Sequence, residues 1–313
     1  MIINISPEIS GQRLDKFLTQ HLKGLSRSQL QKLIKLEAIT VNNLPATAHY
    51  QLKAGDKINI AEKNICGTAN AERLSEKKLP NIKIIDETDE FIVINKPSGL
   101  AVHGRAGYTL ADWLKAKYPA ITEVGDEPER PGIMHRLDKD VSGLMVIAKT
   151  QASFNNLKSQ FQNRIVGKEY VALVHGKILK HSGTINFPII RASQGYKMAA
   201  LPATVKGEAS TLGRQAETRF QVIKKFVNYT LLKIKIITGR THQIRVHLAA
   251  YDHPLLGDNI YATAKTRLKN KKLGLNRIFL IANRLSFTDL QNNKISFKID
   301  LPPELKNILK TVK

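Results

Sequence analysis

The order of the apolar segments after Pro80 constrains the fold of this 313-residue chain more than any other feature. Short apolar or alternating runs that predict strands span residues 91–94, 143–148, 170–174, 218–223 and 231–236. Helical spacing occurs at residues 109–118 and 152–163. Strands and helices do not alternate one by one, as a doubly wound parallel sheet would require. The predicted fold class is therefore α+β, built on a large mixed, mostly antiparallel β-sheet.

A smaller pattern precedes this region. Apolar residues at helical spacing from Leu14 to Leu22, a second helix after a Ser26 N-cap and two strands around Asn43 predict an α-α-β-β unit. Residues 61–80 are polar and aperiodic, which is typical of a linker. We predict a small domain at 11–60, a linker at 61–80 and a larger domain at 81–313.

The charge of the chain indicates its class of partner. Lys plus Arg number 49 and Asp plus Glu 26, which leaves a net charge of +23. Residues 176–250 alone hold thirteen basic and two acidic residues, spread among strand-like segments. Such a surface attracts polyanions, nucleic acid first. No basic amphipathic helix suited to a membrane is evident, so we predict no membrane partner.

The location is predicted from cysteine usage and from the N-terminus. The single cysteine, Cys66, cannot form an intrachain disulfide, which fits a reducing compartment. The segment MIINISPEIS lacks the basic start and apolar core of a signal peptide, and no apolar run approaches about 18 residues. We predict a cytoplasmic protein, with no obligatory protein partner evident.

A polar cluster before an apolar run is the main candidate for chemistry. In PGIMHRLDKDVSGLMVIAKT, residues 131–150, a His, an Arg and two Asp precede a run that predicts a buried strand. Asp138 and Asp140 are two apart, so extended backbone points both carboxylates to one side. DKDV resembles the nucleophile loop of haloacid-dehalogenase-like phosphotransferases. That loop follows its buried strand, however, and GDN at 257–259 comes without the further acids a magnesium site needs.

Two other kinds of site are disfavoured. A helix at HQIRVH, residues 242–247, would point His242 and His247 about 140° apart, whereas a helical zinc pair is spaced i, i+4. Ser142 lies in V-S-G-L and not in the G-x-S-x-G of a nucleophile elbow. We predict no metal site, which leaves a carboxylate in basic surroundings.

Four ordered motifs resemble one family. HRLDKDVSGL resembles the signature of the RluA/RluC/RluD family of pseudouridine synthases, whose Asp is catalytic. NKPSGLAVHG at 95–104, KEYVALVHG at 168–176 and TGRTHQIRVHLAAYDHPLLGD at 238–258 resemble its other motifs. Val141 stands where the family commonly has Thr, which keeps the volume and loses a hydroxyl. The resemblance covers about residues 11–300.

The resemblance implies roles for three residues. Asp138 would be the nucleophile or electrostatic partner, Tyr170 the stacking and proton-handling residue, and Arg245 the ion-pair partner of the Asp. A bidentate arginine would keep the carboxylate ionised, and a tyrosine offers a ring face and a phenolic oxygen. The alternatives are a core aromatic at Tyr170 and a surface helix charge at Arg245. The predicted substrate-binding residues around them are His135, Arg136, Leu137, Arg240 and His242.

The small domain carries a second resemblance. The pattern GQRLDKFL…SRSQLQKLI resembles an S4-type RNA-binding module, although a solvated helix face would show a similar charge pattern. The predicted RNA contacts are Arg13, Lys16, Arg27, Lys32 and Lys35.

Together these features predict an isomerase that converts uridine to pseudouridine in large-subunit ribosomal RNA and needs no cofactor. Asp138 would attack the sugar or take a proton from C2′, and the target base would leave the stack. Residues 274–287 and 95–104 resemble the C branch of the family more closely, whereas residues 135–150 resemble the D branch, and we prefer the C branch. A tRNA synthase and an RNA-binding ribosome-assembly protein remain as alternatives.

Overall fold

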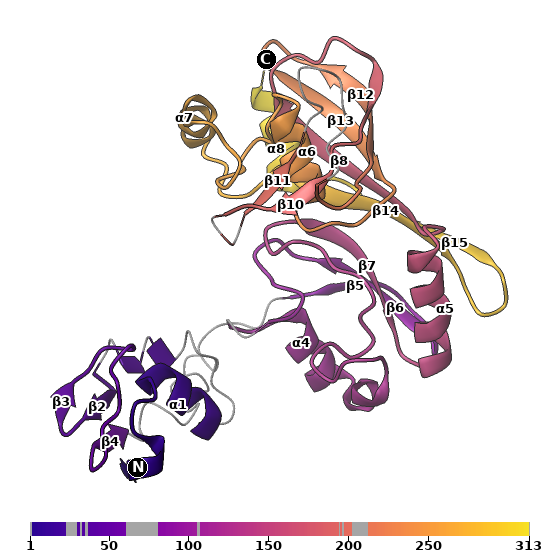
Figure 1. Cartoon of the computed structure of the whole chain (residues 1–313). Helices are drawn as coiled ribbons and strands as arrows, with labels where there is room; N and C mark the ends of the chain where they lie inside the picture. The colour runs from indigo at the N-terminus through magenta and orange to yellow at the C-terminus, as the bar shows by residue number, and fades with distance from the viewer. Residues whose placement is uncertain are drawn as a thin grey trace. The chain divides into compact units, whose positions relative to one another are not determined.

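The structure is a computed structural model that describes residues 2–22, 30–31, 33–34, 37–60, 81–104, 107–193, 195, 197–201 and 212–312. The chain divides into two compact units, Met1–Leu79 and Pro80–Lys313, which Figure 1 colours indigo and magenta to yellow. The predicted linker at 61–80 lies outside the described residues, as do Ser26, Arg27, Lys32 and Lys35. The predicted domain boundaries therefore stay predictions.

The first unit contains β1 (Ile2–Asn4), a 3₁₀ turn (Pro7–Ile9), α1 (Leu14–His21), β2 (Ile39–Val41), β3 (Leu44–Pro45) and β4 (Lys57–Ile60). Its antiparallel sheet has the order β1-β4-β2-β3, so β1, which the sequence did not predict, pairs with β4. Asn42 and Asn43 both have positive φ, 53° and 63°, as a two-residue hairpin turn requires. The expected turn around Asn43 is present.

The charged start of α1 differs from a simple solvated face. Asp15, the one acid of this segment, is fully buried and accepts hydrogen bonds from Arg13 at 3.1 and 3.0 Å and from Gln31 at 2.8 Å. Arg13 also contacts His49. Lys16 is exposed. Arg13 is thus partly committed to the unit's own structure, whereas Lys16 is available at the surface.

The second unit contains all remaining elements. Its strands are β5 (Lys83–Glu87), β6 (Phe91–Lys96), β7 (Ser142–Ala148), β8 (Gly167–His175), β9 (Ser182–Ile185), β10 (Ile189–Arg191), β11 (Met198–Ala200), β12 (Thr218–Lys225), β13 (Tyr229–Ile236), β14 (Leu280–Thr288) and β15 (Lys294–Lys298). Its helices are α4 (Leu110–Lys117), a 3₁₀ turn (Pro119–Glu123), α5 (Gln151–Gln162), α6 (Gln243–Ala250), α7 (Ala264–Lys272) and α8 (Pro303–Thr311). A capping box at Thr109 begins α4, and Thr150 caps α5.

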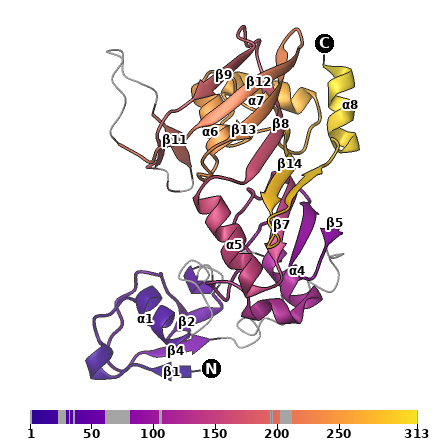
Figure 2. The ribbon, with the colours of Figure 1, turned by 90° about the vertical axis from the view of Figure 1, so that its right-hand side faces the viewer.

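One long sheet organises this unit within the described residues. Its order is β5-β6-β7-β14-β8-β13-β12-β9, with β15 on β14, while β10 and β11 form a separate hairpin. β7 pairs with β14 in parallel and the other pairings are antiparallel. Figures 1 and 2 show α4 and α5 at the β5–β7 end, and α6, α7 and α8 at the β8–β13 end. The predicted α+β class with a mixed, mostly antiparallel sheet is confirmed.

Strand β7 begins directly after the polar cluster at residues 135–140 and lies between β6 and β14 in the sheet. All seven of its residues are buried, and α5 packs against it. Gly143 has φ +128°, and a Cβ at this position would overlap the carbonyl of Ala282 on the parallel neighbour β14. Glycine is therefore required where the chain enters the strand. The S-G-L of the motif places β7 against β14 and so fixes the segment that precedes it.

Candidate active site

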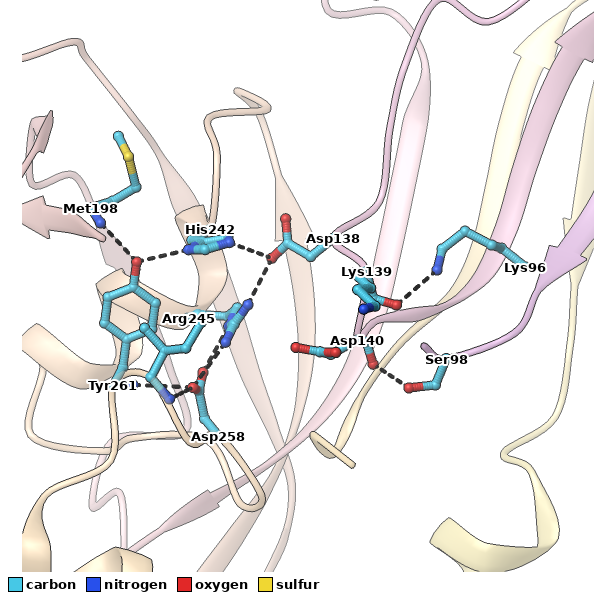
Figure 3. A network of polar contacts seen from close by, with 11 residues as sticks. Lys96, Ser98, Asp138, Lys139, Asp140, Met198, His242, Arg245, Asp258 and Tyr261 are labelled. Carbon is cyan, nitrogen blue, oxygen red and sulfur yellow. Dashed lines mark hydrogen bonds and ion pairs between the residues drawn. The ribbon is translucent and has the colours of Figure 1, made fainter. Parts of the chain in front are cut away.

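A loop at residues 133–141 carries Asp138 to the site, and the segment after β6 holds that loop. Gly99 donates its backbone N–H to the Lys139 carbonyl at 2.8 Å, and the Ser98 hydroxyl donates to the Asp140 carbonyl at 2.6 Å. Val141 N–H bonds to the carbonyl of Asp138 at 3.1 Å, which closes a turn. Figure 3 shows the contact between Ser98 and Asp140 in the loop next to Asp138. The NKPSG motif thus supports the backbone that positions Asp138.

Lys96 is the buried anchor of this support. Its side chain is 0% exposed, and Nζ donates to the carbonyls of Pro97 at 2.9 Å, Leu100 at 2.7 Å and Lys139 at 3.2 Å. Burial lowers the pKa of Lys96 to about 7, although Asp138 and Asp140 oppose the shift. The three acceptors match the three protons of an ammonium group. Lys96 therefore ties the end of β6 to the Asp138 loop.

Arg245, on α6, lies between two carboxylates. Its Nε and Nη2 donate to Asp258 at 2.8 and 3.0 Å, and its Nη1 approaches Asp138 Oδ2 at 3.4 Å. Both Arg245 and Asp258 are almost fully buried, with exposed fractions of 3% and 1%. The expectation that Arg245 makes a bidentate pair with Asp138 is wrong, because Asp258 takes that pair. Asp138 receives one longer contact from the remaining nitrogen.

Arg245 and Asp258 each stabilise the charged form of the other. Burial would raise the pKa of Asp258, but the hydrogen bonds and charge of Arg245 lower it. Burial likewise opposes the charge on Arg245, but bonds to Asp258 and the attraction of Asp138 raise its pKa. Asp258 also accepts the backbone N–H groups of Ile260 and Tyr261 at 2.9 and 3.1 Å. The guanidinium is consequently held charged and fixed beside Asp138.

His242 approaches Asp138 from the other side. Its Nε2 lies 4.0 Å from Asp138 Oδ2, and its Nδ1 lies 2.9 Å from the Tyr261 hydroxyl. Met198 N–H donates to that hydroxyl at 2.9 Å, which leaves the hydroxyl proton for Nδ1 and favours hydrogen on Nε2. Desolvation lowers the pKa of His242, against the pull of Asp138. A neutral imidazole therefore presents an N–H toward the carboxylate.

The backbone of His242 is unusual. Its φ of 55° and ψ of 18° lie in the left-handed region at the N-terminus of α6. Gln243 holds this turn, since its Oε1 accepts from the Thr238 hydroxyl at 2.7 Å and from Arg240 N–H at 3.0 Å. Its Nε2 donates to the Glu217 carbonyl at 3.0 Å. Such a conformation in a residue other than glycine is typical of functional sites, where surrounding bonds maintain it.

Tyr170 lies on β8 with its ring toward the Asp138 pocket. The residue is 6% exposed, opposite Ile234 on β13 and Ala282 on β14. Burial and then the charge of Asp138 raise the pKa of its hydroxyl. Within the described part of the chain, no hydrogen bond joins this hydroxyl to another residue. Tyr170 can therefore act as a neutral donor, whereas a phenolate base would be costly here.

The structure gathers most of the predicted residues around one pocket. Its lining includes Arg136, Leu137, Asp138, Tyr170, Arg240, His242 and Arg245. His135 does not line it. His135 Nε2 accepts the Val146 N–H at 3.1 Å, and its ring stacks on Phe161 at 4.4 Å, facing an adjoining cavity. His135 thus lies in the adjoining cavity and not beside Asp138, and its predicted role in substrate binding stays a prediction.

Asp258, Tyr261, Gln243 and Lys96 were not predicted as site residues. Asp258 was considered only for a magnesium site, although an acid after the apolar pair in HPLLGD was a usable signal in so basic a region. A lysine at the end of an apolar strand was the corresponding signal for Lys96. No local pattern singles out Tyr261 or Gln243, because their partners lie elsewhere in the chain.

The profile of a family described as RNA pseudouridylate synthase matches residues 90–250, which include Asp138, Tyr170 and Arg245. The chain belongs to this family. An S4 domain profile matches residues 12–58. The enzyme is therefore an RNA pseudouridine synthase, an isomerase, with an S4 domain and RNA as its substrate.

Curated relatives match this synthase over nearly its whole length. A protein of Vibrio vulnificus named ribosomal large subunit pseudouridine synthase C is 34% identical over 92% of this chain and 88% of its own. The protein with the same name in Escherichia coli is 32% identical over the same shares. An uncharacterized RNA pseudouridine synthase of Aquifex aeolicus is 36% identical over 98% of this chain and 96% of its own.

Solved structures agree on the fold. Human RNA pseudouridylate synthase domain containing 4 superposes with a TM-score of 0.60 at 28% identity, over 78% of this chain and 95% of that one. The human domain containing 1 gives 0.60 at 25% identity, over 74% and 89%. Both likenesses are consistent with the sheet described above.

Two further features of the described residues concern membranes and metal ions. None of the helices described is long and apolar enough to cross a membrane. Over the same residues, His, Cys, Asp and Glu side chains do not gather in any group of three or more that could hold a metal ion. A cytoplasmic location, independence of cofactors and the lack of an obligatory protein partner stay predictions.

Proposed function

We propose that this synthase isomerises uridines in large-subunit ribosomal RNA, with the specificity of the C branch in preference to that of the D branch. The relatives from Vibrio vulnificus and Escherichia coli carry the name ribosomal large subunit pseudouridine synthase C. The net charge of +23 and the S4 domain suit a large, folded RNA. The match to C-type relatives along nearly the whole chain is the observation that carries the choice of substrate.

The reaction needs no net oxidation. The bond between N1 and C1′ of the uridine breaks, the uracil turns within the pocket, and a bond forms between C5 and C1′. The proton on C5 is lost and N1 gains a proton, so atoms and electrons balance. The protein must therefore hold the detached base, stabilise the sugar and move one proton.

We assign each of these tasks to a residue of the pocket. Asp138 is the catalytic carboxylate, with 17% of its side chain exposed toward the substrate space. It would act on C1′ as a nucleophile or on C2′ as a base. Arg245 places positive charge 3.4 Å from it, and His242 presents an N–H at 4.0 Å. Tyr170 offers its ring to the uracil and its neutral hydroxyl as a donor.

The test begins in cells that lack the gene. Carbodiimide-dependent stops of reverse transcription map pseudouridine in total RNA, and we expect specific stops in large-subunit RNA to depend on this gene. Complementation with Asp138→Asn should not restore them, although the variant should fold and bind RNA. Asp140→Asn is the matched control, because it removes the same charge from an exposed side chain in the same loop.

Each outcome discriminates. Restoration of the stops by Asp138→Asn would exclude Asp138 as the catalytic residue. Gene-dependent stops confined to tRNA would replace the proposed substrate, and unchanged stops in both RNAs would favour an assembly role. The positions of lost stops also separate C-branch from D-branch specificity.

A further inference from the structure

A second cavity adjoins the pocket at Asp138. It has a volume of about 400 Å³, within the range of sites that hold small ligands. Arg136, Tyr170, Ile236 and Gly239 line both spaces. A molecule bound at Asp138 would therefore have its covalent neighbour at the mouth of this second cavity.

Lys168 is the notable side chain of the second cavity. It precedes Tyr170 by two positions on β8, so the two side chains point to the same face of the sheet. Burial lowers the pKa of Lys168, and its Nζ lies 5.2 Å from the centre of the Phe161 ring. No hydrogen bond or ion pair joins its ammonium group to another side chain or carbonyl in the described ranges. A half-buried cation without a counter-charge costs free energy unless a ligand supplies one.

The other charges of the cavity do not supply that partner. Asp126 pairs with Lys158 at 2.8 Å, and Glu127 pairs with Arg130. Arg136, which bridges the two spaces, contacts the neutral ring of His103 at 3.2 Å and no carboxylate among the residues described. Two cations, from Lys168 and Arg136, thus remain for an anionic group from outside.

The cavity also has an apolar part. Met134 and Phe161 are half-buried and pack at the edge of the main core, and both line the cavity. Carbon surface beside two cations matches a nucleotide, which has a flat base and one negative phosphate. An acidic peptide would use the cations but would leave the carbon surface without a partner.

We propose that this cavity binds the nucleotide next to the target uridine, with Lys168 in contact with its phosphate. The proposal rests on the proposed function, because it places the uridine at Asp138. Neighbouring nucleotides are joined through one phosphate, so a strand that enters the Asp138 pocket passes Arg136 and reaches Lys168. The cavity thereby reads the single-stranded form of the substrate and helps hold the target base out of its stack.

The test compares two lysine variants on one substrate. The substrate is a transcript of the large-subunit RNA around a pseudouridine mapped in cells. Lys168→Met should raise KM about tenfold, with a smaller change in kcat, because a charged hydrogen bond to substrate is lost. The slope of log affinity against log salt should become shallower by about 0.7, the value for one phosphate of a single strand. Lys168→Arg should keep the slope.

Lys233→Met is the matched control. Lys233 lies on the neighbouring strand β13, on the opposite face of the sheet, where it pairs with Glu169 at 3.1 Å. Lys233→Met removes the same charge as Lys168→Met, but from the face of the sheet away from the cavity. The slope of log affinity against log salt for Lys233→Met should therefore equal that of the wild type. Equal slopes for Lys168→Met and Lys233→Met would overturn the proposal.

A chemical change in the substrate gives an independent check. A neutral methylphosphonate at one linkage beside the target uridine should weaken binding to the wild type and leave Lys168→Met almost unaffected. Equal loss for both proteins at every linkage would contradict the assignment. If the wild-type protein forms no pseudouridine in any RNA, the proposed function has failed, and that result is separate from the comparison of slopes.

Discussion

The buried carboxylate of Asp258 should be essential to the stability of the second unit, Pro80–Lys313. Asp258→Asn keeps the acceptor for Ile260 and Tyr261 but sets an amide N–H₂ against the Nε–H of Arg245, a donor that then lacks its Asp258 acceptor. Arg245 then keeps a buried charge, with Asp138 at 3.4 Å as its one carboxylate contact. Removing one partner of a buried ion pair costs about 3–5 kcal/mol.

Thermal unfolding followed by circular dichroism measures this loss. For a unit of the size of Pro80–Lys313, 1 kcal/mol corresponds to about 2–4 °C, so Asp258→Asn should lower Tm by about 6–20 °C. Glu304→Gln is the control, because Glu304 pairs with Arg277 at 2.9 Å but is 50% exposed. An exposed pair contributes about 0–1 kcal/mol. Equal shifts of Tm for the two variants would refute the argument.

A double variant separates stability from catalysis. Arg245→Met with Asp258→Asn removes both charges and keeps the acceptor for Ile260 and Tyr261, which should recover part of the lost Tm. The double variant should lack pseudouridine synthase activity, because Asp138 has lost its guanidinium neighbour.

The stabilisation by Asp258 should also vanish in acid. Its folded pKa is lowered, so its contribution is present above about pH 3.9 and disappears as the pH falls through the folded value.

Two further predictions concern residues at the edge of the site. Tyr170→Phe should change the free energy of unfolding by less than about 1 kcal/mol and should keep RNA binding, because the Tyr170 hydroxyl has no described partner. Tyr170→Leu should weaken RNA binding, because the ring is lost. Equal RNA-binding constants for the two variants would contradict a stacking role. Burial lowers the pKa of His135 to about 3, so the unfolded state binds more protons below pH 6.5 and stability falls as the pH drops. The slope should reach at most about 1.4 kcal/mol per pH unit, less because His135 is partly exposed. His135→Gln, which keeps an acceptor for Val146, should flatten urea-unfolding stability between pH 7 and pH 5, and an unchanged slope would show that His135 does not carry it.

The periodic strands and helices were predictable because local burial determines their pattern. The predicted run at 143–148 lies within β7, and 170–174 lies within β8. The helix predicted at 109–118 corresponds to α4, where a capping box marks the start. Strand β1 was missed because its three residues are exposed or half-buried and show no alternation of the kind that burial produces. Strands β10 and β11 are three residues each, too short for a period to appear.

The sequence predicted several residues of the candidate site but not how they connect. Asp138 and Arg245 meet across 107 residues, and no pattern in either motif states that Asp258 takes the two best donors of the guanidinium. That arrangement follows from the fold: α6 and the loop after it close on the segment that β7 and the NKPSG turn hold in place. A bidentate pair with Asp138 would have occupied the carboxylate that faces the substrate in the proposed reaction. By binding Asp258 instead, Arg245 leaves Asp138 with one long contact from the guanidinium, so the buried pair is best understood as a fixed support beside the carboxylate that we propose as catalytic.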